Sequence, residues 1–171
     1  TYVDNMSYES LVVDKDRIIA LFEANGDSLI KNPYAISINS SGNDIFKYQT
    51  SSINYRIADA TRVDKNNRFW AINYFFPRDR GVLKPGDDIL ASKYGEGLTH
   101  SKSERVERLV EYKIHNKKVL ITNNPPIEIK LEGEKTSRKW EAIARYEDKG
   151  FLLATDKYPK PYTLFAYVPI N

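Results

Sequence analysis

A segment that occurs three times in the sequence constrains the fold most, because a chain built from copies of one unit must stack those units. The copies run from Tyr8 to Glu23, from Ala58 to Asn73 and from Trp140 to Asp156. Each opens with an acid and small or apolar residues, reaches a polar turn, and returns through an apolar run too short for a helix. Each copy is therefore predicted to be a β-hairpin.

The spacing of the copies predicts larger units. The opening acids Glu9, Asp59 and Glu141 are 50 and 82 residues apart, and a propeller blade of four strands occupies about 40 to 50 residues. The first interval fits one blade, with its last two strands at 33–38 and 45–50. The second fits a blade with a long insertion at 77–105, after which strands resume at 106–114 and 119–131. The third adds a strand at 163–168 and lacks a fourth.

These units predict an all-β chain that forms part of a β-propeller. We expect one incomplete domain, 1–171, with about three blades at 7–50, 56–131 and 138–168. Propellers close with about four to eight blades, so the natural interpretation is half of a six-bladed ring. Because the chain begins at Thr1, we expect an upstream portion that was removed or is a separate chain. Open strand edges invite pairing, so the expected partner is that missing N-terminal half or a second copy.

Composition narrows the classes of function. A net charge of +3, with Lys and Arg spread among the acids, gives no basic stripe for nucleic acid. No apolar run approaches the roughly 18 residues of a membrane span. The absence of cysteine excludes disulfides, thiolate zinc sites and a cysteine nucleophile. The marks of serine hydrolases, nucleotide-driven enzymes and zinc proteases are also missing.

Five segments together resemble the esterase-like phytase-type propeller proteins of bacteria. They are 55–64 (YRIADATRVD), 68–75 (RFWAINYF), 93–100 (KYGEGLTH), 106–112 (VERLVEY) and 138–145 (RKWEAIAR). The likeness spans nearly the whole chain and corresponds to the C-terminal half of that domain. It implies a six-bladed propeller, export to the periplasm or outside, and hydrolysis of esters or phosphoesters. One departure is that Glu9, Asp59 and Glu141 are followed by Ser or Ala where Gly is expected.

The hairpins predict a rim of carboxylates. Because the strands of a hairpin are antiparallel, Glu9 should neighbour Glu23, and Glu141 should neighbour Asp156. Together with Asp59 of the middle blade, these acids would gather at one mouth of the channel. Clustered oxygen ligands suit a hard cation such as calcium, so Glu9, Glu23, Asp59 and Asp156 are the predicted metal ligands. The alternative is structural, with each acid accepting backbone N–H groups of the next unit.

Three other residues are predicted to bind an anionic or ester substrate. Arg56 and Arg138 each precede a blade acid by three residues, and guanidinium groups match phosphate or carboxylate oxygens. The alternative is that each arginine pairs with its own blade acid. In the middle blade, Tyr74 occupies the position that matches Glu23 and Asp156 when residues are counted from the start of the return strand. Asn73 would replace Tyr74 there if a bulge shifted the phase.

Glu141 and His100 are the predicted catalytic residues. His100 lies in the long insertion, which follows a strand that ends at the mouth, so it could act as a base or a ligand. In metal-assisted hydrolysis the cation would polarise the ester and activate water, and an acid or His100 would take the proton. Two other functions stay open: a non-catalytic propeller that binds a protein, glycan or small ligand at its mouth, and a structural module.

Overall fold

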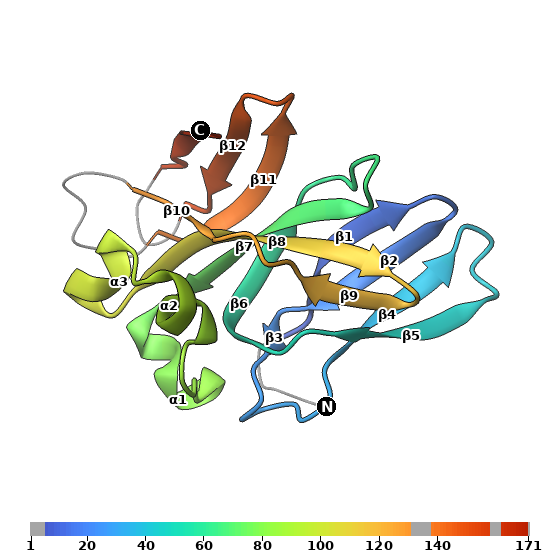
Figure 1. The fold of residues 1–171 in the computed structure, drawn as a ribbon, viewed down its shortest axis with the longest axis horizontal. Coiled ribbons are helices and arrows are strands. Elements are labelled where there is room, and N and C mark those ends of the chain that lie inside the picture. Colours follow the sequence, from blue (N-terminus) through green and yellow to red (C-terminus); the bar gives the residue numbers. More distant parts are fainter. Residues whose placement is uncertain (1–5, 131–137, 158–161, 171) are drawn as a thin grey trace.

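A computed structural model describes residues 6–130, 138–157 and 162–170 as an all-β fold with short helices on one side (Figure 1). Its strands form three antiparallel meanders in chain order. The first meander consists of β1 (Tyr8–Asp14), β2 (Arg17–Phe22), β4 (Tyr34–Asn39) and β5 (Ile45–Thr50). The second consists of β6 (Ile53–Ala60), β7 (Arg68–Phe75), β8 (Val106–His115) and β9 (Lys118–Ile121). The third consists of β11 (Trp140–Tyr146), β12 (Gly150–Thr155) and β13 (Phe165–Pro169).

The three predicted hairpins are confirmed as β1–β2, β6–β7 and β11–β12. Each turns through a residue in the left-handed region, with φ of 57° at Lys15, 59° at Asn67 and 50° at Glu147. In the middle hairpin the Asp64 carboxylate holds the turn by accepting from the N–H groups of Asn66 and Arg68 at 2.8 and 2.9 Å. Short polar turns between apolar strands thus reverse the chain as the sequence indicates.

All three hairpins carry a β-bulge at the same place in the repeat. The register shifts between Tyr8 and Ser10, between Ile57 and Ala60, and between Trp140 and Ala142. The opening acid of each copy therefore lies within the irregular part of its strand. A bulge leaves residues unpaired and redirects their side chains, so the repeat fixes where these acids point.

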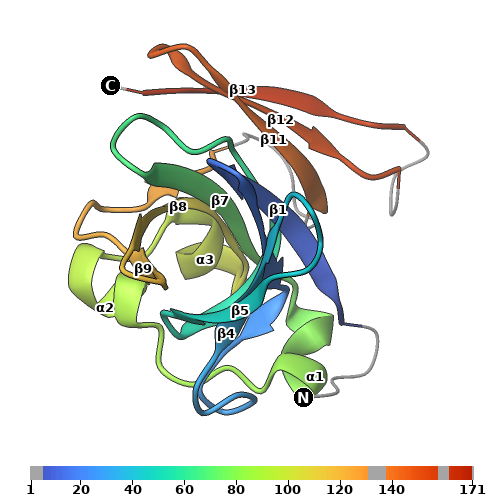
Figure 2. The same ribbon diagram turned by 90° about the vertical axis from the view of Figure 1, so that its right-hand side faces the viewer.

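The first two meanders share one curled sheet, whereas the sequence predicts separate blades. The strands β5 and β9 pair in parallel, and the short strand β3 (Ala24–Asn25) pairs with β6. The N–H group of Ile57 donates to the Glu23 carbonyl at 2.8 Å, which brings β6 against the end of β2. The resulting sheet curls into a half-barrel, and the third meander forms a separate layer across one side of it (Figure 2).

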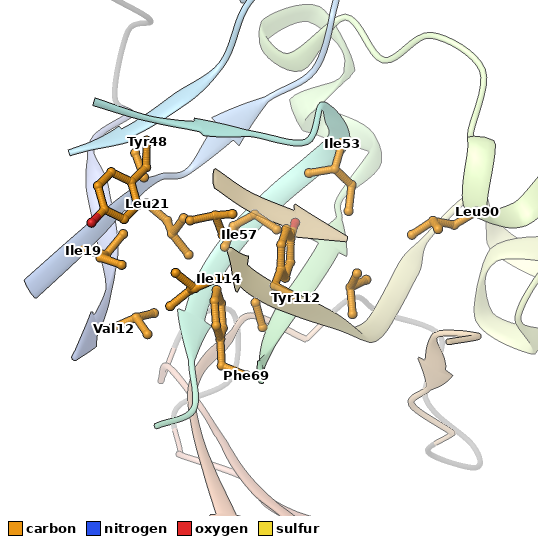
Figure 3. Packing of buried hydrophobic residues seen from close by; sticks show 14 residues of the cluster. Val12, Ile19, Leu21, Tyr48, Ile53, Ile57, Phe69, Leu90, Tyr112 and Ile114 are labelled. Atoms are coloured by element: carbon orange, nitrogen blue, oxygen red, sulfur yellow. The ribbon is translucent and has the colours of Figure 1, made fainter. Parts of the chain in front are cut away.

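The second meander lies between two hydrophobic cores. One core fills the curl of the large sheet, where Val12, Ile19 and Leu21 of the first meander meet Ile57 and Phe69 of the second (Figure 3). The other core fills the space between the second and third meanders, and includes Trp70, Ile72, Leu109, Ile143, Phe151 and Leu153. Both faces of β7 are therefore buried. The central hairpin is the part of the fold most enclosed by apolar contacts.

The insertion at 77–105 is helical, whereas the sequence predicts an irregular loop. It contains η1 (Pro77–Asp79), α1 (Arg80–Leu83), α2 (Ile89–Tyr94) and α3 (Leu98–Ser103). Pro77 begins the first turn, and the Asp88 side chain caps α2 by accepting from two backbone N–H groups. No helix among the described residues is long and apolar enough to cross a bilayer.

The strand predicted at 119–131 is also shorter than expected. The strand β9 ends at Ile121, and Pro125 and Pro126 precede the two-residue strand β10 (Ile127–Glu128), which pairs with β8. Proline lacks the N–H group that a ladder requires, so the two prolines explain the interruption. The last predicted residue, 131, lies outside the described residues.

Candidate functional site

The structure brings the four predicted rim acids Glu9, Glu23, Glu141 and Asp156 into electrostatic contact. Glu23 is affected by the charges of Glu9 and Glu141, and Glu141 is affected by those of Glu9 and Asp156. Glu9, Glu141 and Asp156 are exposed, whereas the Glu23 side chain is 2% exposed. We call these four residues the carboxylate rim. It combines acids from the first and third meanders, because the bulges of β1 and β11 lie at the same end of the fold.

Arg56 supports the rim from β6. It forms ion pairs with Glu23 and, through Nε, with Asp79 Oδ2 at 2.7 Å. The alternative to substrate binding was pairing with its own blade acid, Asp59, but Arg56 pairs with acids of other segments. Two carboxylates thus share one guanidinium, and the pKa of Arg56 lies above its ordinary value because these hydrogen bonds and charges outweigh its burial. Little of the positive charge of Arg56 is left for an anionic ligand.

Burial raises the pKa of Glu23 to about 7. The ion pair with Arg56 opposes this shift, and the charges of Glu9 and Glu141 add to it. One carboxylate oxygen meets Arg56, while the other, Oε2, is buried without a hydrogen-bond partner among the described residues. The pKa of Glu141 is also raised, first by burial and then by Glu9. The carboxylate rim therefore contains two carboxyl groups, Glu23 and Glu141, that keep their protons to a higher pH than ordinary carboxyl groups do.

In the middle hairpin, strand register decides which residue matches Glu23 and Asp156. The pairs Ser10–Leu21, Ala60–Ala71 and Ala142–Ala154 are equivalent across the copies. Two residues further along each return strand are Glu23, Asn73 and Asp156, so the bulge gives the position to Asn73. Counting from the first apolar residue misses this because the turn of the middle hairpin is longer.

The Asn73 side chain nevertheless bonds to groups outside the carboxylate rim, and Tyr74 is the residue that interacts with the rim. The Asn73 amide donates to the Asn54 and Arg56 carbonyls and accepts from Arg108 Nε at 2.9 Å. Burial raises the pKa of Tyr74, and the next cause is the charge of Glu141. Tyr74 is 4% exposed, so its hydroxyl group can influence Glu141 but offers little surface to a substrate.

Asp59 has the structural role that we gave as the alternative to metal binding, namely accepting a backbone N–H group of the next unit. Its Oδ2 accepts a hydrogen bond from the N–H group of Ile143 at 2.9 Å. This bond joins β6 of the second meander to the bulged strand β11 of the third. The carboxylate thus satisfies a backbone donor of the neighbouring unit, as buried donors require.

Arg138 is buried and its charge is paired. Its guanidinium bonds the Glu107 carboxylate of β8, with Nε at 2.8 Å, and the Trp140 indole donates to the same carboxylate at 2.8 Å. Arg138 and Glu107 are 5% and 2% exposed. A substrate cannot reach this pair without local unfolding, so the pair joins the second and third meanders instead of binding an anion.

His100 lies in a cleft beside the helical insertion. The cleft has a volume of about 610 Å³, and its lining includes Tyr55, Phe75, Arg80, Asp88 and His100. The His100 Nδ1 atom is 3.9 Å from Asp88, whose carboxylate forms a two-point ion pair with Arg108 at 2.9 and 3.1 Å. His100 thus contacts residues of the cleft, among them Asp88 and Tyr55, and not Glu141.

The rim does not form a ready metal site. Within 6–130, 138–157 and 162–170, no group of three or more acidic or histidine side chains is arranged to hold a metal ion. Two of the predicted ligands already accept hydrogen bonds, Glu23 from Arg56 and Asp59 from the N–H group of Ile143. A calcium ion needs six to eight oxygen ligands, and the side chains that remain are the three exposed ones, Glu9, Glu141 and Asp156.

The sequence interpretation missed the roles of Glu107 and Arg108. Both are 2% exposed within β8, whose first seven residues are all buried. Charged side chains that alternate into a buried strand must be paired, and this was the available signal. Comparisons with protein-family models, with curated proteins and with solved structures found no match for this chain.

Proposed function

We propose that this chain contributes the active site of a hydrolase for uncharged carboxylic esters, with Glu141 as the general base. One observation carries the proposal: the Glu141 side chain is accessible to solvent, and partial burial together with the charge of Glu9 raises its pKa, at a rim to which separate meanders contribute. A general base works best when its pKa approaches the working pH. The charges of the neighbouring acids Glu9 and Asp156 add to the effect of burial and would maintain that raised pKa.

The proposed reaction needs one proton acceptor. The Glu141 carboxylate takes a proton from water while the water oxygen forms a bond to the ester carbonyl carbon. The resulting tetrahedral species then breaks its bond to the alkoxy oxygen, which receives the proton from Glu141. The products are a carboxylic acid and an alcohol, and Glu141 returns to its starting state.

Charge at the rim favours an uncharged ester over a phosphoester. The rim contributes four carboxyl groups, and Arg56 is already shared between Glu23 and Asp79. Arg138 is shielded with Glu107. A phosphate monoester would bring further negative charge close to these acids without a free guanidinium to bind it. Of the two activities that the family resemblance implies, ester hydrolysis therefore fits the rim better than phosphoester hydrolysis.

Calcium at the rim is a separate proposal. Glu9, Glu141 and Asp156 could approach a cation together, and water would have to supply the remaining ligands. A titration with calcium distinguishes the two proposals, because a base mechanism predicts the same ester turnover with calcium and with chelator.

The test measures hydrolysis of p-nitrophenyl acetate and p-nitrophenyl phosphate by the purified chain. We expect turnover of the acetate, with a rate reduced about 100-fold or more in Glu141→Gln, as is usual when a general base is removed. Glu147→Gln is the matched control, because Glu147 is exposed in the turn that follows β11 and pairs with Lys149. Equal rates for wild type and Glu141→Gln would refute the assignment.

We also propose that the three meanders correspond to blades of a propeller. Three antiparallel meanders with a bulge at the same position support a common repeat unit. Closure would require further units beyond these.

The cleft beside His100 favours an alternative function, binding without turnover. Its volume of about 610 Å³ lies within the roughly 300 to 1,000 Å³ of small-ligand sites. Tyr55 and Phe75, with ring centres 4.7 Å apart, supply an aromatic wall. NMR with a library of small amines and sugars tests this: shifts confined to Tyr55, Phe75, Arg80 and residues 85–104, without ester turnover, would favour the alternative.

A further inference from the structure

The third meander has an outer face composed of apolar side chains. Two cross-strand rows form it, Ala142–Ala154–Phe165 and Ala144–Leu152–Tyr167. Residues directly opposite each other on paired strands point to the same side. Leu152 is 48% exposed, Phe165 82% and Tyr167 50%. We call these six residues the outer face; the opposite side of the same sheet is buried in the core shared with the second meander.

The equivalent residues of the first meander are buried. Register makes Ser10–Leu21 equivalent to Ala142–Ala154, and Val12–Ile19 equivalent to Ala144–Leu152. In the first meander these four side chains are at most 3% exposed. The same face is thus buried in the first meander and exposed in the third. An exposed apolar patch of this kind marks an interaction site.

Within the chain, this face packs against the same face of another unit. Ile19 and Leu21 are equivalent to Phe69 and Ala71 of the second meander, and all four lie in one core. Units of this repeat therefore associate through like positions. The face left open on the third meander therefore fits the same face of another unit, and a second copy of this chain supplies one.

The outer face is self-complementary in size and charge. The strand β11 contributes the small residues Ala142 and Ala144, and β13 contributes the large residues Phe165 and Tyr167. A two-fold axis parallel to the strands and passing over β12 places β11 of one copy above β13 of the other. Large side chains then fill the space over alanines, and none of the six residues brings a charge to the axis.

We propose that this chain forms a two-fold symmetric dimer through the outer face of the third meander. The same patch on both subunits makes an isologous interface, which closes at two copies. Three strands spaced about 4.8 Å apart and about five residues long give a patch of roughly 14 by 17 Å. Such a patch is smaller than a standard interface, so the dimer should be weak and transient and should form only at high protein concentration.

Sedimentation equilibrium between about 2 and 200 µM tests the dimer. We expect the mass to rise from 19.7 kDa toward twice that value. Leu152→Glu should stay monomeric, because two carboxylates would meet near the axis. Leu11→Glu is the matched control: Leu11 is 59% exposed on the outer side of the first meander, and this variant should dimerise like wild type. Far-UV circular dichroism checks that both variants fold.

A cross-link tests the orientation independently, since the chain has no cysteine of its own. Stacked sheets lie about 10 Å apart, which is too far for a disulfide, so the test uses a bis-maleimide linker of about 10 Å. A mixture of the single variants A142C and F165C should give a mixed covalent dimer, and neither variant alone should. An intrachain link is excluded because each chain carries a single cysteine. A monomer at every concentration, a dimer that survives Leu152→Glu, or one that Leu11→Glu abolishes would each overturn the proposal.

Discussion

Arg138 and Glu107 form a buried ion pair between the second and third meanders, and the Trp140 indole donates to the same carboxylate. Buried pairs of this kind contribute modestly as pairs, but removing one partner leaves an uncompensated charge. The pair therefore makes the stability of the second and third meanders interdependent. Its position also explains why Arg138 cannot serve a substrate.

Arg138→Met should destabilise the chain by about 3 to 5 kcal/mol, because Glu107 would remain buried without its guanidinium. Urea unfolding followed by tryptophan fluorescence measures this, since Trp140 reports on the pair. The double variant Glu107→Leu with Arg138→Met is the control and should recover much of the loss. An unchanged unfolding midpoint in Arg138→Met would show that the pair is not formed.

Asp59 should behave as a link between units and not as a metal ligand. Asp59→Ala leaves the Ile143 N–H group without its acceptor and should cost about 1 to 3 kcal/mol of stability. Asp59→Asn keeps an oxygen acceptor and should cost less. Thermal unfolding with and without calcium separates the roles: a metal ligand would show calcium-dependent stability that both variants lose.

Glu23 should make stability fall as pH rises between about 4.5 and 7. Its pKa is raised from 4.5 to about 7 by burial, so over this range the folded state holds a proton that the unfolded state has released. Stability is then complete below pH 4.5 and declines as Glu23 ionises, by at most about 1.4 kcal/mol per pH unit for one proton.

Glu23→Gln should remove that part of the pH dependence, as measured by urea unfolding at several pH values. Glu128 is the matched comparison, because burial also raises its pKa to about 7. Glu128→Gln should remove its own share, and the double variant should flatten the profile further. A Glu23→Gln profile identical to that of wild type would show that the Arg56 ion pair keeps Glu23 charged throughout.

The hairpins could be predicted because alternating apolar residues and polar turns are local signals. The joining of β5 to β9 and of β3 to β6 could not, since pairing between distant strands depends on the curl of the whole sheet. Antiparallel geometry alone predicted the pairs Glu9–Glu23 and Glu141–Asp156, whereas the meeting of the two pairs was expected only from the propeller hypothesis. The partners of Asp59 and Arg138 did not, because a repeat shows which positions are equivalent but not which neighbouring unit each side chain meets.

If Glu141 is the general base, its neighbours should set the pH dependence of ester hydrolysis. The charge of Glu9 raises the pKa of Glu141, so Glu9→Gln should lower that pKa and shift the acidic limb of the pH–rate profile to lower pH. Asp156→Asn should shift it in the same direction, since Asp156 also raises the pKa. Glu147→Gln, at the far end of β11, should leave the midpoint unchanged. A midpoint that moves upward in Glu9→Gln, or that stays fixed in both rim variants, would exclude Glu141 as the group that titrates.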